Sequence, residues 1–441
     1  MSLDAHRFGA ARLALLIIIA LPLLAGCVGS SSDDDTISWQ DVPPTVAPTP
    51  DPEEALTGMG GATGPLPTVG AAPEAPGQPS HDTTALLSPE ELKQHQPNEL
   101  GVVPVLEYHV ITTDPNQVAQ FVRLADDMRA DLEWLYANNF YIVPLSDVVD
   151  NTIKAPPGKH PVALTFDDGT SSQFAYKEDA NGEIVMDENG DPVIDPDTAV
   201  GILEEFYARH PDAGSGAHFA PLIFNAFAEP DHPQQAPLFD QKVKWMVDNG
   251  YEIGNHTWQH TNLTDIPTDE FMMTVAEPQI YMNNLLGDHP GNASDILTLP
   301  YGTTPDKDLH PDQRQLMMDG FSYDGHDIYL SGALLVGADP SQSPASTDWH
   351  KLWIPRVQMF KESVEFWFGM IERGELILYT SDGNPDTIVI PNPQHPSLEG
   401  KLNTEGLAAA GKQVIAYNPE NGQAVAFGFP AIARRDEGVL G

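Results

Sequence analysis

The chain has 441 residues, and its 21 Lys and Arg against 64 Asp and Glu give a formal net charge of −43 at pH 7. Such a charge repels polyanions, so it argues against a nucleic-acid partner and against binding to an anionic lipid surface. It is typical of a hydrated surface adapted to high salt, or else of a surface that attracts a cationic glycan.

The N-terminus has the pattern of a bacterial lipoprotein signal. A weakly basic start precedes an apolar segment from Leu13 to Leu24, which is too short to cross a bilayer as a helix. Small residues then precede Cys27, the only cysteine, which excludes an internal disulfide. We therefore expect residues 1–26 to be a signal peptide and Cys27 to carry a lipid anchor, in a bacterial envelope membrane, periplasmic or at the cell surface. The alternative is an ordinary secretory signal followed by a cysteine without a role.

Residues 27–100 have the composition of a linker. Ten prolines lie between Pro43 and Pro79, among Gly, Ala, Thr and Ser, and large apolar residues are too few to offset chain entropy. The sequence therefore predicts a disordered, Pro-rich tether that holds the folded part away from the membrane.

From residue 101 to 390, strand-like and helix-like segments alternate. Strands are predicted at residues 102–111, 140–143, 162–168, 218–224, 251–254, 296–299 and 376–379, and helices at 115–139, 199–209, 239–249, 268–286, 312–319 and 362–373, with a short helix capped by Ser146. This alternation predicts an α/β fold with parallel strands and crossover helices. Many short strands favour a closed or nearly closed barrel, and the alternative is a doubly wound open sheet.

Two segments depart from the alternation. Residues 171–197 are an acidic insertion, in which Asn189-Gly190 between apolar runs predicts a β-hairpin with a tight turn. A calcium loop is the weaker alternative, because the glutamate that an EF-hand needs is absent from this segment. Residues 391–441 contain strand-like pieces at 413–417 and 424–429 and are expected to form an appendage on the barrel.

Two adjacent carboxylates end the predicted strand at residues 162–168. Val162-Ala-Leu-Thr-Phe is suited to a buried strand, and Asp167-Asp168-Gly169 ends it abruptly. Two acids at a buried strand end are costly to desolvate unless a metal or a reaction uses them. We therefore expect a functional site here rather than a pair of acids that caps a turn.

His256 and His260 follow another predicted strand and are expected to meet the Asp pair, because functional groups of α/β barrels gather at the strand ends. A spacing of four on a helical turn would present both rings to the same side. Two imidazoles and one carboxylate commonly hold zinc or another divalent metal and leave positions for water and substrate. The other carboxylate could then accept a proton from water, whose pKa such a metal lowers.

A third motif, Leu297-Thr-Leu-Pro-Tyr-Gly302, is typical of a strand end whose backbone amide can face an oxyanion. The three motifs together resemble the polysaccharide deacetylase family, carbohydrate esterase family 4, whose members remove acetyl groups from N-acetylated sugars. The resemblance covers residues 101–382. It includes Thr165-Phe-Asp-Asp168, His256-Thr-Trp-Gln-His260 and, in the opening strand, Tyr108-His109.

The resemblance implies a distorted (β/α) barrel of about seven parallel strands. It also implies a role for each motif residue: Asp167 as general base, Asp168, His256 and His260 as ligands of a divalent metal, zinc before others, and the Tyr301 backbone as part of the oxyanion hole.

Two features of the family pattern are absent. Thr298 occupies the position of the motif arginine, and Arg356 is a candidate to supply that positive charge. The predicted strand at 376–379 lacks the histidine that serves the family as general acid, a contribution of typically about 10²–10⁴-fold. Asp382 just beyond it is the candidate replacement, provided that its pKa is raised. His109 by itself is interpreted as a hydrogen-bonded structural histidine.

The sequence therefore predicts a membrane-anchored, metal-dependent hydrolase that removes N-acetyl groups from an amino-sugar polysaccharide of the bacterial envelope. The competing hypothesis is a catalytically weak or inactive glycan-binding lipoprotein on a degenerate deacetylase fold. The absent histidine and arginine favour that hypothesis, whereas the intact Asp167 opposes it, because a pure binder needs no base. A hydrolase that acts on a different amide or on an ester is the third hypothesis.

Overall fold

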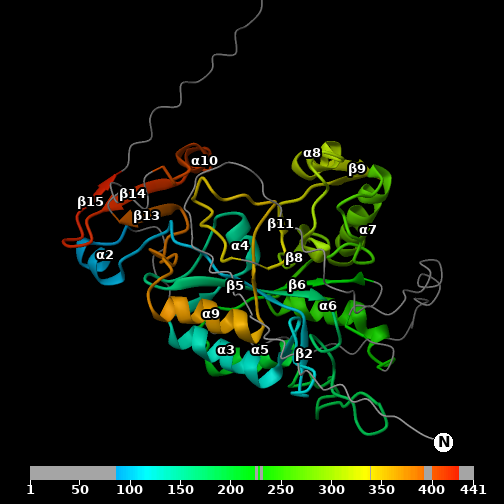
Figure 1. Cartoon of the computed structure of the whole chain (residues 1–441). Helices are drawn as coiled ribbons and strands as arrows, with labels where there is room; N and C mark the ends of the chain where they lie inside the picture. Colours follow the sequence, from blue (N-terminus) through cyan, green and yellow to red (C-terminus); the bar gives the residue numbers. More distant parts are fainter. Residues whose placement is uncertain (1–85, 224–226, 229–231, 338, 392–399, 427–441) are drawn as a thin grey trace, which may run out of the picture. The chain divides into compact units, whose positions relative to one another are not determined.

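A sheet of eight strands forms the centre of the computed structural model (Figure 1). The structure describes residues 86–223, 227–228, 232–337, 339–391 and 400–426. The strands of the sheet are β1 (Val105–Tyr108), β4 (Phe140–Ile142), β5 (His160–Asp168), β6 (His218–Pro221), β7 (Glu252–Asn255), β8 (Asn292–Thr298), β11 (Gly332–Leu334) and β12 (Val357–Gln358). All of their pairings are parallel.

The sheet curves into a distorted barrel. Its order is β12, β1, β5, β6, β7, β8, β11, with β4 beside the first half of β5. A doubly wound sheet would instead reverse its order at a switch point. Ile354 forms a parallel bridge with Leu334 of β11, and Val357 pairs with Leu106 of β1, so residues 354–358 connect the two ends of the sheet. The predicted distorted (β/α) barrel with about seven parallel strands is confirmed.

Crossover helices connect most of the strands. They are α3 (Ala125–Ala137), α5 (Ala199–Arg209), α6 (Phe239–Asp248), α7 (Thr268–Leu286), α8 (Pro311–Asp319) and α9 (Lys361–Glu372). The observed bounds of α5 and α7 are those predicted. The helix predicted at 115–139 begins only at Ala125, because β2 (Val110–Thr112) and β3 (Val122–Leu124) pair with each other before it. Within the described residues, none of the helices combines the length and apolar character that a membrane span requires.

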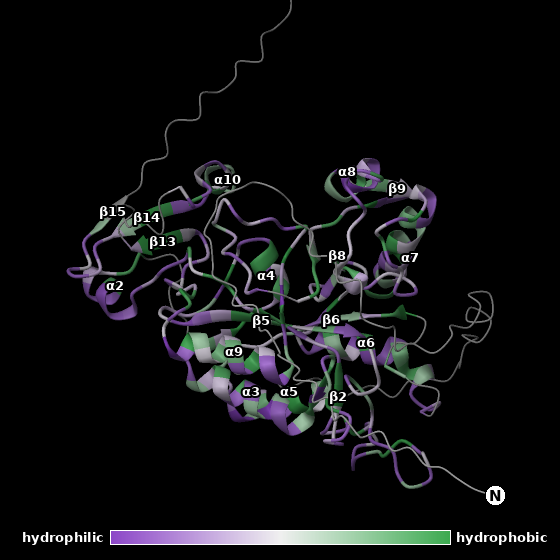
Figure 2. Ribbon diagram, in the orientation of Figure 1, coloured by the Kyte–Doolittle hydropathy of each residue, from purple (hydrophilic) through white to green (hydrophobic). Residues whose placement is uncertain are grey.

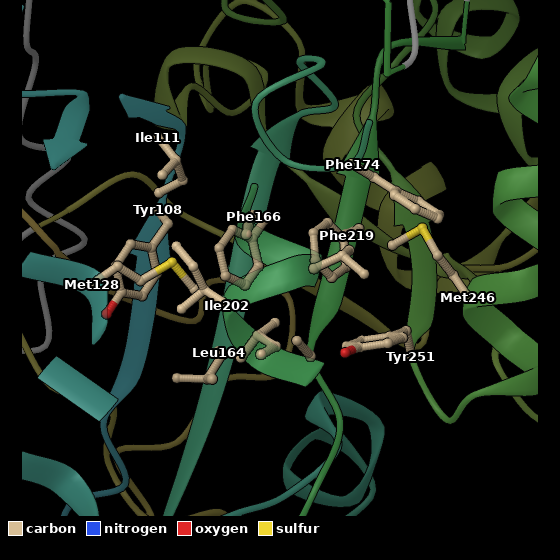
Figure 3. Packing of buried hydrophobic residues seen from close by; sticks show 14 of the residues in the cluster. Tyr108, Ile111, Met128, Leu164, Phe166, Phe174, Ile202, Phe219, Met246 and Tyr251 are labelled. Atoms are coloured by element: carbon tan, nitrogen blue, oxygen red, sulfur yellow. The ribbon is translucent and has the colours of Figure 1, made fainter. Parts of the chain in front are cut away.

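The side chains of β1 and β5 alternate between the two faces of the barrel wall, as the period of two in a strand requires. Leu106 and Tyr108 face the outer core with Leu164 and Phe166, whereas Val105 and Ala163 belong to the inner cluster. The Phe166 ring stacks on Tyr108 at 5.1 Å and on Phe219 at 4.5 Å between ring centroids (Figure 3). Apolar colour follows β5 in Figure 2, whereas α3 and α9 have mixed surfaces.

The short helix α4 (Leu145–Val149) lies at the inner face, where its residues join the inner cluster. Its start differs from the prediction, because Ser146 lies inside the helix and does not cap it. Instead, the Glu252 carboxylate of β7 accepts hydrogen bonds from the backbone N–H of Leu145 at 2.9 Å and of Ser146 at 3.2 Å. A carboxylate from a distant strand therefore replaces the local cap.

The N-terminal predictions are only partly tested. Residues 1–26 and Cys27 lie outside the described residues, as does most of the predicted tether. The end of that tether was predicted wrongly, because Pro89–His95 form helix α2 with a capping box between Ser88 and Glu91. Leu92 of α2 is buried against the C-terminal sheet, which offsets the cost of ordering this segment.

The C-terminal appendage is a separate sheet of three strands in the order β13 (Thr387–Pro391), β14 (Gln413–Tyr417) and β15 (Ala424–Ala426), accompanied by helix α10 (Thr404–Ala409). The strand predicted at 413–417 is confirmed. β13 starts before the predicted boundary at 391, and residues beyond 426 lie outside the described part of the chain.

The acidic insertion contains the predicted hairpin at Asn189-Gly190, with an antiparallel bridge between Met186 and Pro192. It also has a repeat of eight residues that was not predicted. The backbone N–H of Lys177 donates to Val193, that of Val193 to Val185, and that of Val185 to Lys177, at 2.8 to 2.9 Å, which closes a ring.

The predicted strand at 376–379 is wrong. Among the described residues of this segment, Leu378 makes one isolated parallel bridge with Val102, and no regular strand forms. The place next to β1 belongs to β12, and β11 ends the other side of the sheet. Both strands were missed, because two or three residues are too short to produce an alternating pattern.

Candidate active site

The strand register brings two carboxylates to the same end of the barrel. Tyr108 pairs with Phe166 at the end of the β1–β5 ladder, and both rings face outward. Glu107 and Asp167, one residue away from each ring, therefore face inward near the carboxyl ends of their strands. Both carboxylates are almost completely buried.

Asp168, His256 and His260 form the group that the motifs predicted. His256 Nε2 lies 3.3 Å and His260 Nε2 lies 3.7 Å from Asp168 Oδ1. The histidines lie on a turn after β7 rather than on a helix, and their ring centroids are 4.9 Å apart. One donor atom from each of the three residues lies within 4.8 Å of the others.

The chemistry of this group suits a divalent metal. His256 Nδ1 contacts the Thr298 carbonyl oxygen at 2.8 Å, so Nδ1 carries a proton and Nε2 is the atom that faces Asp168. Within the described residues, His256 Nε2 is buried without a hydrogen-bond partner. Burial, together with the neighbouring His256, lowers the pKa of His260 to about 4, which keeps that imidazole neutral. The residues therefore fit zinc or a similar ion.

Backbone strain is concentrated at this site. Asp168, Thr257, His260 and Tyr301 all have positive φ, between 55° and 74°, a region that L-residues rarely adopt. Each such residue costs about 1–3 kcal/mol, which the surrounding contacts must offset. Strain of this kind clusters at functional sites, where it holds side chains in a fixed arrangement.

Arg356 supplies the positive charge that is absent at Thr298. It lies just before β12 and is fully buried, and its two terminal nitrogens each contact one oxygen of Asp167 at 2.7 Å. Burial would raise the pKa of Asp167, but the charge and hydrogen bonds of Arg356 hold that pKa well below its usual range. Asp167 is therefore ionised and retains lone pairs that can accept a proton.

His109 lies beside this ion pair. Its Nε2 is 3.7 Å from Glu107 Oε1 and 3.7 Å from Asp167 Oδ2, and its ring packs against Phe121. Glu107, His109 and Asp167 are close enough together to bind a cation. However, Arg356 already occupies both oxygens of Asp167 and lies 3.6 Å from Glu107.

The sequence-based interpretation of His109 as a hydrogen-bonded structural histidine did not identify these two carboxylate neighbours. The Glu-x-His pattern at 107–109 was the available signal, because a period of two directs both side chains of such a pattern to the same face.

Tyr301 and Thr298 both lie at the end of β8. The Tyr301 ring is 4.3 Å from the His260 ring and is partly exposed. Thr298 is fully buried, and its carbonyl oxygen orients His256. The motif at 297–302 therefore reaches the site through Tyr301 and through the backbone of Thr298.

Asp382 lies away from the site, so its proposed role as proton donor requires correction. Neighbouring Ser381 contacts the chain that leads into β5: its hydroxyl donates to Ala155, and its carbonyl oxygen accepts from Gly158. Asp167 is the eighth residue of the nine-residue strand β5, so it lies roughly 23 Å from that strand's start. Burial raises the pKa of Asp382, as the role would require. However, its carboxylate accepts hydrogen bonds from the Thr387 hydroxyl and from the backbone N–H of Asn384.

A barrel whose strand ends gather a carboxylate pair and two histidines is an arrangement suited to metal-assisted hydrolysis. Residues 224–319 match the family model described as Polysaccharide deacetylase. The matched segment contains His256, His260 and Tyr301, whereas Asp167 and Asp168 precede it. The resemblance to this family that the motifs indicated is therefore confirmed over this segment. None of the curated proteins matches the chain.

Solved structures of similar proteins match part of this chain. BA0330 of Bacillus anthracis is 18% identical over 58% of this chain and 64% of its own, with a TM-score of 0.40. The deacetylase PplD of Streptococcus pyogenes, solved with acetate, is 16% identical over 59% of this chain and 92% of its own, with a TM-score of 0.41. BC0361, a polysaccharide deacetylase of Bacillus cereus, is 16% identical over 58% and 65%, with a TM-score of 0.39. The match thus spans less than two thirds of the two Bacillus proteins.

Proposed function

We propose that the protein is a metal-dependent hydrolase that removes acetyl groups from an N-acetylated amino-sugar polysaccharide. The observation that carries this proposal is the ionised Asp167, paired with Arg356, beside the group of Asp168, His256 and His260. A protein that only binds glycans has no need of a buried base in this position. The match of residues 224–319 to the polysaccharide deacetylase model supports acetylated polysaccharide as the substrate class.

Each residue has a defined task in this proposal. A zinc or similar ion held by Asp168, His256 and His260 would polarise the amide carbonyl and make water more acidic. Asp167 accepts a proton from the attacking water, and the Tyr301 backbone amide faces the oxygen on which negative charge develops. His109 gives a proton to the nitrogen as its bond to the acetyl carbon breaks, so the amine leaves neutral. Acetate and a free amino sugar are the products.

His109 fills the role that was assigned to Asp382. Its Nε2 lies 3.7 Å from Asp167, so one substrate amide can contact both groups. Arg356 likewise fills the role of the motif arginine. The two departures from the family pattern therefore have counterparts at the site, which favours a hydrolase over an inactive binder.

We further propose that a lipid anchor at Cys27 attaches this enzyme to a bacterial envelope membrane, periplasmic or at the cell surface. The signal-like segment before Cys27 supports this location. Labelling of the expressed chain with a radioactive fatty acid, compared with Cys27→Ser, tests it. Equal labelling of both chains would exclude the anchor.

Metal content and acetate release from an N-acetylglucosamine oligomer, measured on the same samples, test the function. We expect about one ion per wild-type chain, together with acetate release. His256→Ala should lose both, and Asp167→Asn should lose only acetate release, by about 10²–10⁴-fold. His326→Ala, at an exposed position, should lose neither. Bound metal in the wild type without acetate release would favour the glycan-binding hypothesis.

A further inference from the structure

Gln173 is a fully buried amide in the segment that follows β5. Its Nε2 donates to the carbonyl oxygen of His109 at 2.8 Å and also to the carbonyl oxygen of Asp167. Because both acceptors are carbonyl oxygens, the NH₂ end of the amide must face them. One side chain therefore bridges the backbones of the proposed proton donor and the proposed base.

The bridge lies where the sheet no longer holds these two residues together. The last paired residues of β1 and β5 are Tyr108 and Phe166, one position before His109 and Asp167. Beyond them, the two hydrogens of the Gln173 amide take the place of a further ladder contact. The backbone of Gln173 is itself fixed by two hydrogen bonds. Its N–H donates to the carbonyl oxygen of Thr170, and its carbonyl oxygen accepts from the N–H of Val200 in α5.

Among the residues that the structure describes, the oxygen atom of the Gln173 side-chain amide lacks the hydrogen bonds that its nitrogen atom makes. Gln173 Oε1 is buried and has no hydrogen-bond partner in the described part of the chain. A buried acceptor without a partner costs stability. The two hydrogen bonds that Nε2 donates to the backbones of His109 and Asp167 offset that cost, and this double contact distinguishes Gln173.

We propose that Gln173 is a positioning residue that sets the distance between His109 and Asp167. This inference rests on the proposed function, in which these residues donate and accept protons on opposite sides of one amide bond. Gln173 touches neither the substrate nor the metal ligands in this role. Its loss should allow His109 to move relative to Asp167, while Asp168, His256 and His260 keep their places.

The leaving group of the substrate separates this role from a general structural one. An amine must be protonated as it leaves, whereas the phenolate of an aryl acetate leaves without a proton. We therefore expect Gln173→Leu to lower kcat for an N-acetylglucosamine oligomer by about 10–100-fold. Hydrolysis of the aryl acetate, KM and metal content should change by less than about threefold.

The matched control is Gln279→Leu. Gln279 of α7 is also buried, donates to one backbone carbonyl, that of Tyr329, and has a buried oxygen without a described partner. This variant should leave the ratio of amide to ester hydrolysis unchanged. Gln173→Met, which keeps the length of the side chain but has no hydrogen-bond donor, should show the same selective loss and serves if Gln173→Leu does not fold.

A readout that needs no turnover is the NMR signal of the His109 ring in ¹⁵N-histidine-labelled full-length protein, assigned with His109→Gln. It should shift in the Gln173 variants and not in Gln279→Leu. An equal loss on both substrates, or an unchanged His109 signal, would overturn the positioning role. A wild-type protein that hydrolyses neither substrate would instead refute the proposed function, and the NMR comparison would still decide whether Gln173 holds His109.

Discussion

Replacement of Arg356 by methionine tests the site directly. The Arg356 side chain forms a buried ion pair that stabilises the fold, and in the proposed mechanism it keeps the base Asp167 ionised. Arg356 is completely buried and bonds both oxygens of Asp167, the Thr165 hydroxyl at 3.0 Å and the Leu335 carbonyl oxygen at 2.7 Å. Methionine has a similar length but no donor and no charge. The substitution therefore leaves Asp167 as a buried carboxylate without its cation.

This geometry allows the loss of unfolding free energy and the loss of kcat in Arg356→Met to be estimated. Removal of one partner of a buried ion pair costs about 3–5 kcal/mol of unfolding free energy. Without Arg356, burial raises the pKa of Asp167 with less opposition, so the ionised form of the base is less favoured. Loss of the base lowers kcat by about 10²–10⁴-fold, which corresponds to about 2.7–5.5 kcal/mol in the barrier. Arg356→Lys keeps the charge but not the two-pronged contact, so intermediate effects are expected.

Arg123 provides the matched control. Its guanidinium also makes a two-pronged contact with a buried aspartate, Asp131, at 2.9 and 2.6 Å. This pair involves the Tyr108 hydroxyl on the outer face of β1 and makes no described contact with Asp168, His256 or His260. Arg123→Met should therefore lose a similar unfolding free energy, measured with urea, while the molecules that remain folded keep their acetate release. An Arg356→Met protein with wild-type kcat, or a similar loss of kcat in both variants, would refute the reasoning.

The pH dependence of activity tests whether Arg356 lowers the pKa of Asp167. A general base works when it is ionised, so activity exists above its pKa and disappears as the pH falls through it. In the wild type, Arg356 holds the pKa of Asp167 well below its usual range, so Asp167 does not limit activity in mild acid. In Arg356→Lys the acidic limb of kcat/KM should move to higher pH, and it should not move in Arg123→Lys.

Three further outcomes are expected. Burial and the neighbouring Asp382 raise the pKa of Glu99 well above its usual value, so the free energy of unfolding should fall as the pH rises through that pKa. Glu99→Gln should remove this part of the fall, unlike Glu188→Gln at an exposed position. Asp382→Asn should keep acetate release within about threefold of wild type, since its carboxylate is remote from Asp167, and a loss above about 10²-fold would contradict that placement. Tyr301→Gly keeps the backbone N–H and the positive φ that glycine adopts freely, so kcat should stay within about tenfold, whereas a larger loss would assign a role to the ring.

The parts of the fold that could be predicted are those with long local patterns. α5 and α7 have the predicted bounds, because an apolar face repeated over several turns is visible in the sequence itself. β5 was recognisable for a related reason, since its apolar run ends abruptly in Asp167-Asp168. The group of Asp168, His256 and His260 was predictable because each of its members lies in a short motif at a strand end.

The remainder of the site depends on contacts between distant residues. Residues 376–379 have strand-like composition, yet β12 takes the place beside β1, because the pairing of edge segments is decided by tertiary contacts. This error misplaced Asp382, since the carboxylate was assigned to a strand end that does not exist. The contact between Arg356 and Asp167 joins residues 189 positions apart, and no local pattern specifies it. Arg356 could be named as a candidate only from the absence of the motif arginine.

The same closure of the barrel would allow the proposed hydrolase to work without either motif residue. β12 pairs with β1, and β1 pairs with β5, so side chains from three neighbouring segments converge inside the barrel beside Asp167. His109 arrives from the end of β1, and Arg356 from the residue just before β12. A base at the end of β5 can therefore be paired and matched with a proton donor from the β1 side of the sheet, without help from β8 or residues 376–382. The proposed chemistry requires a cation and an imidazole at Asp167, whichever strand provides them.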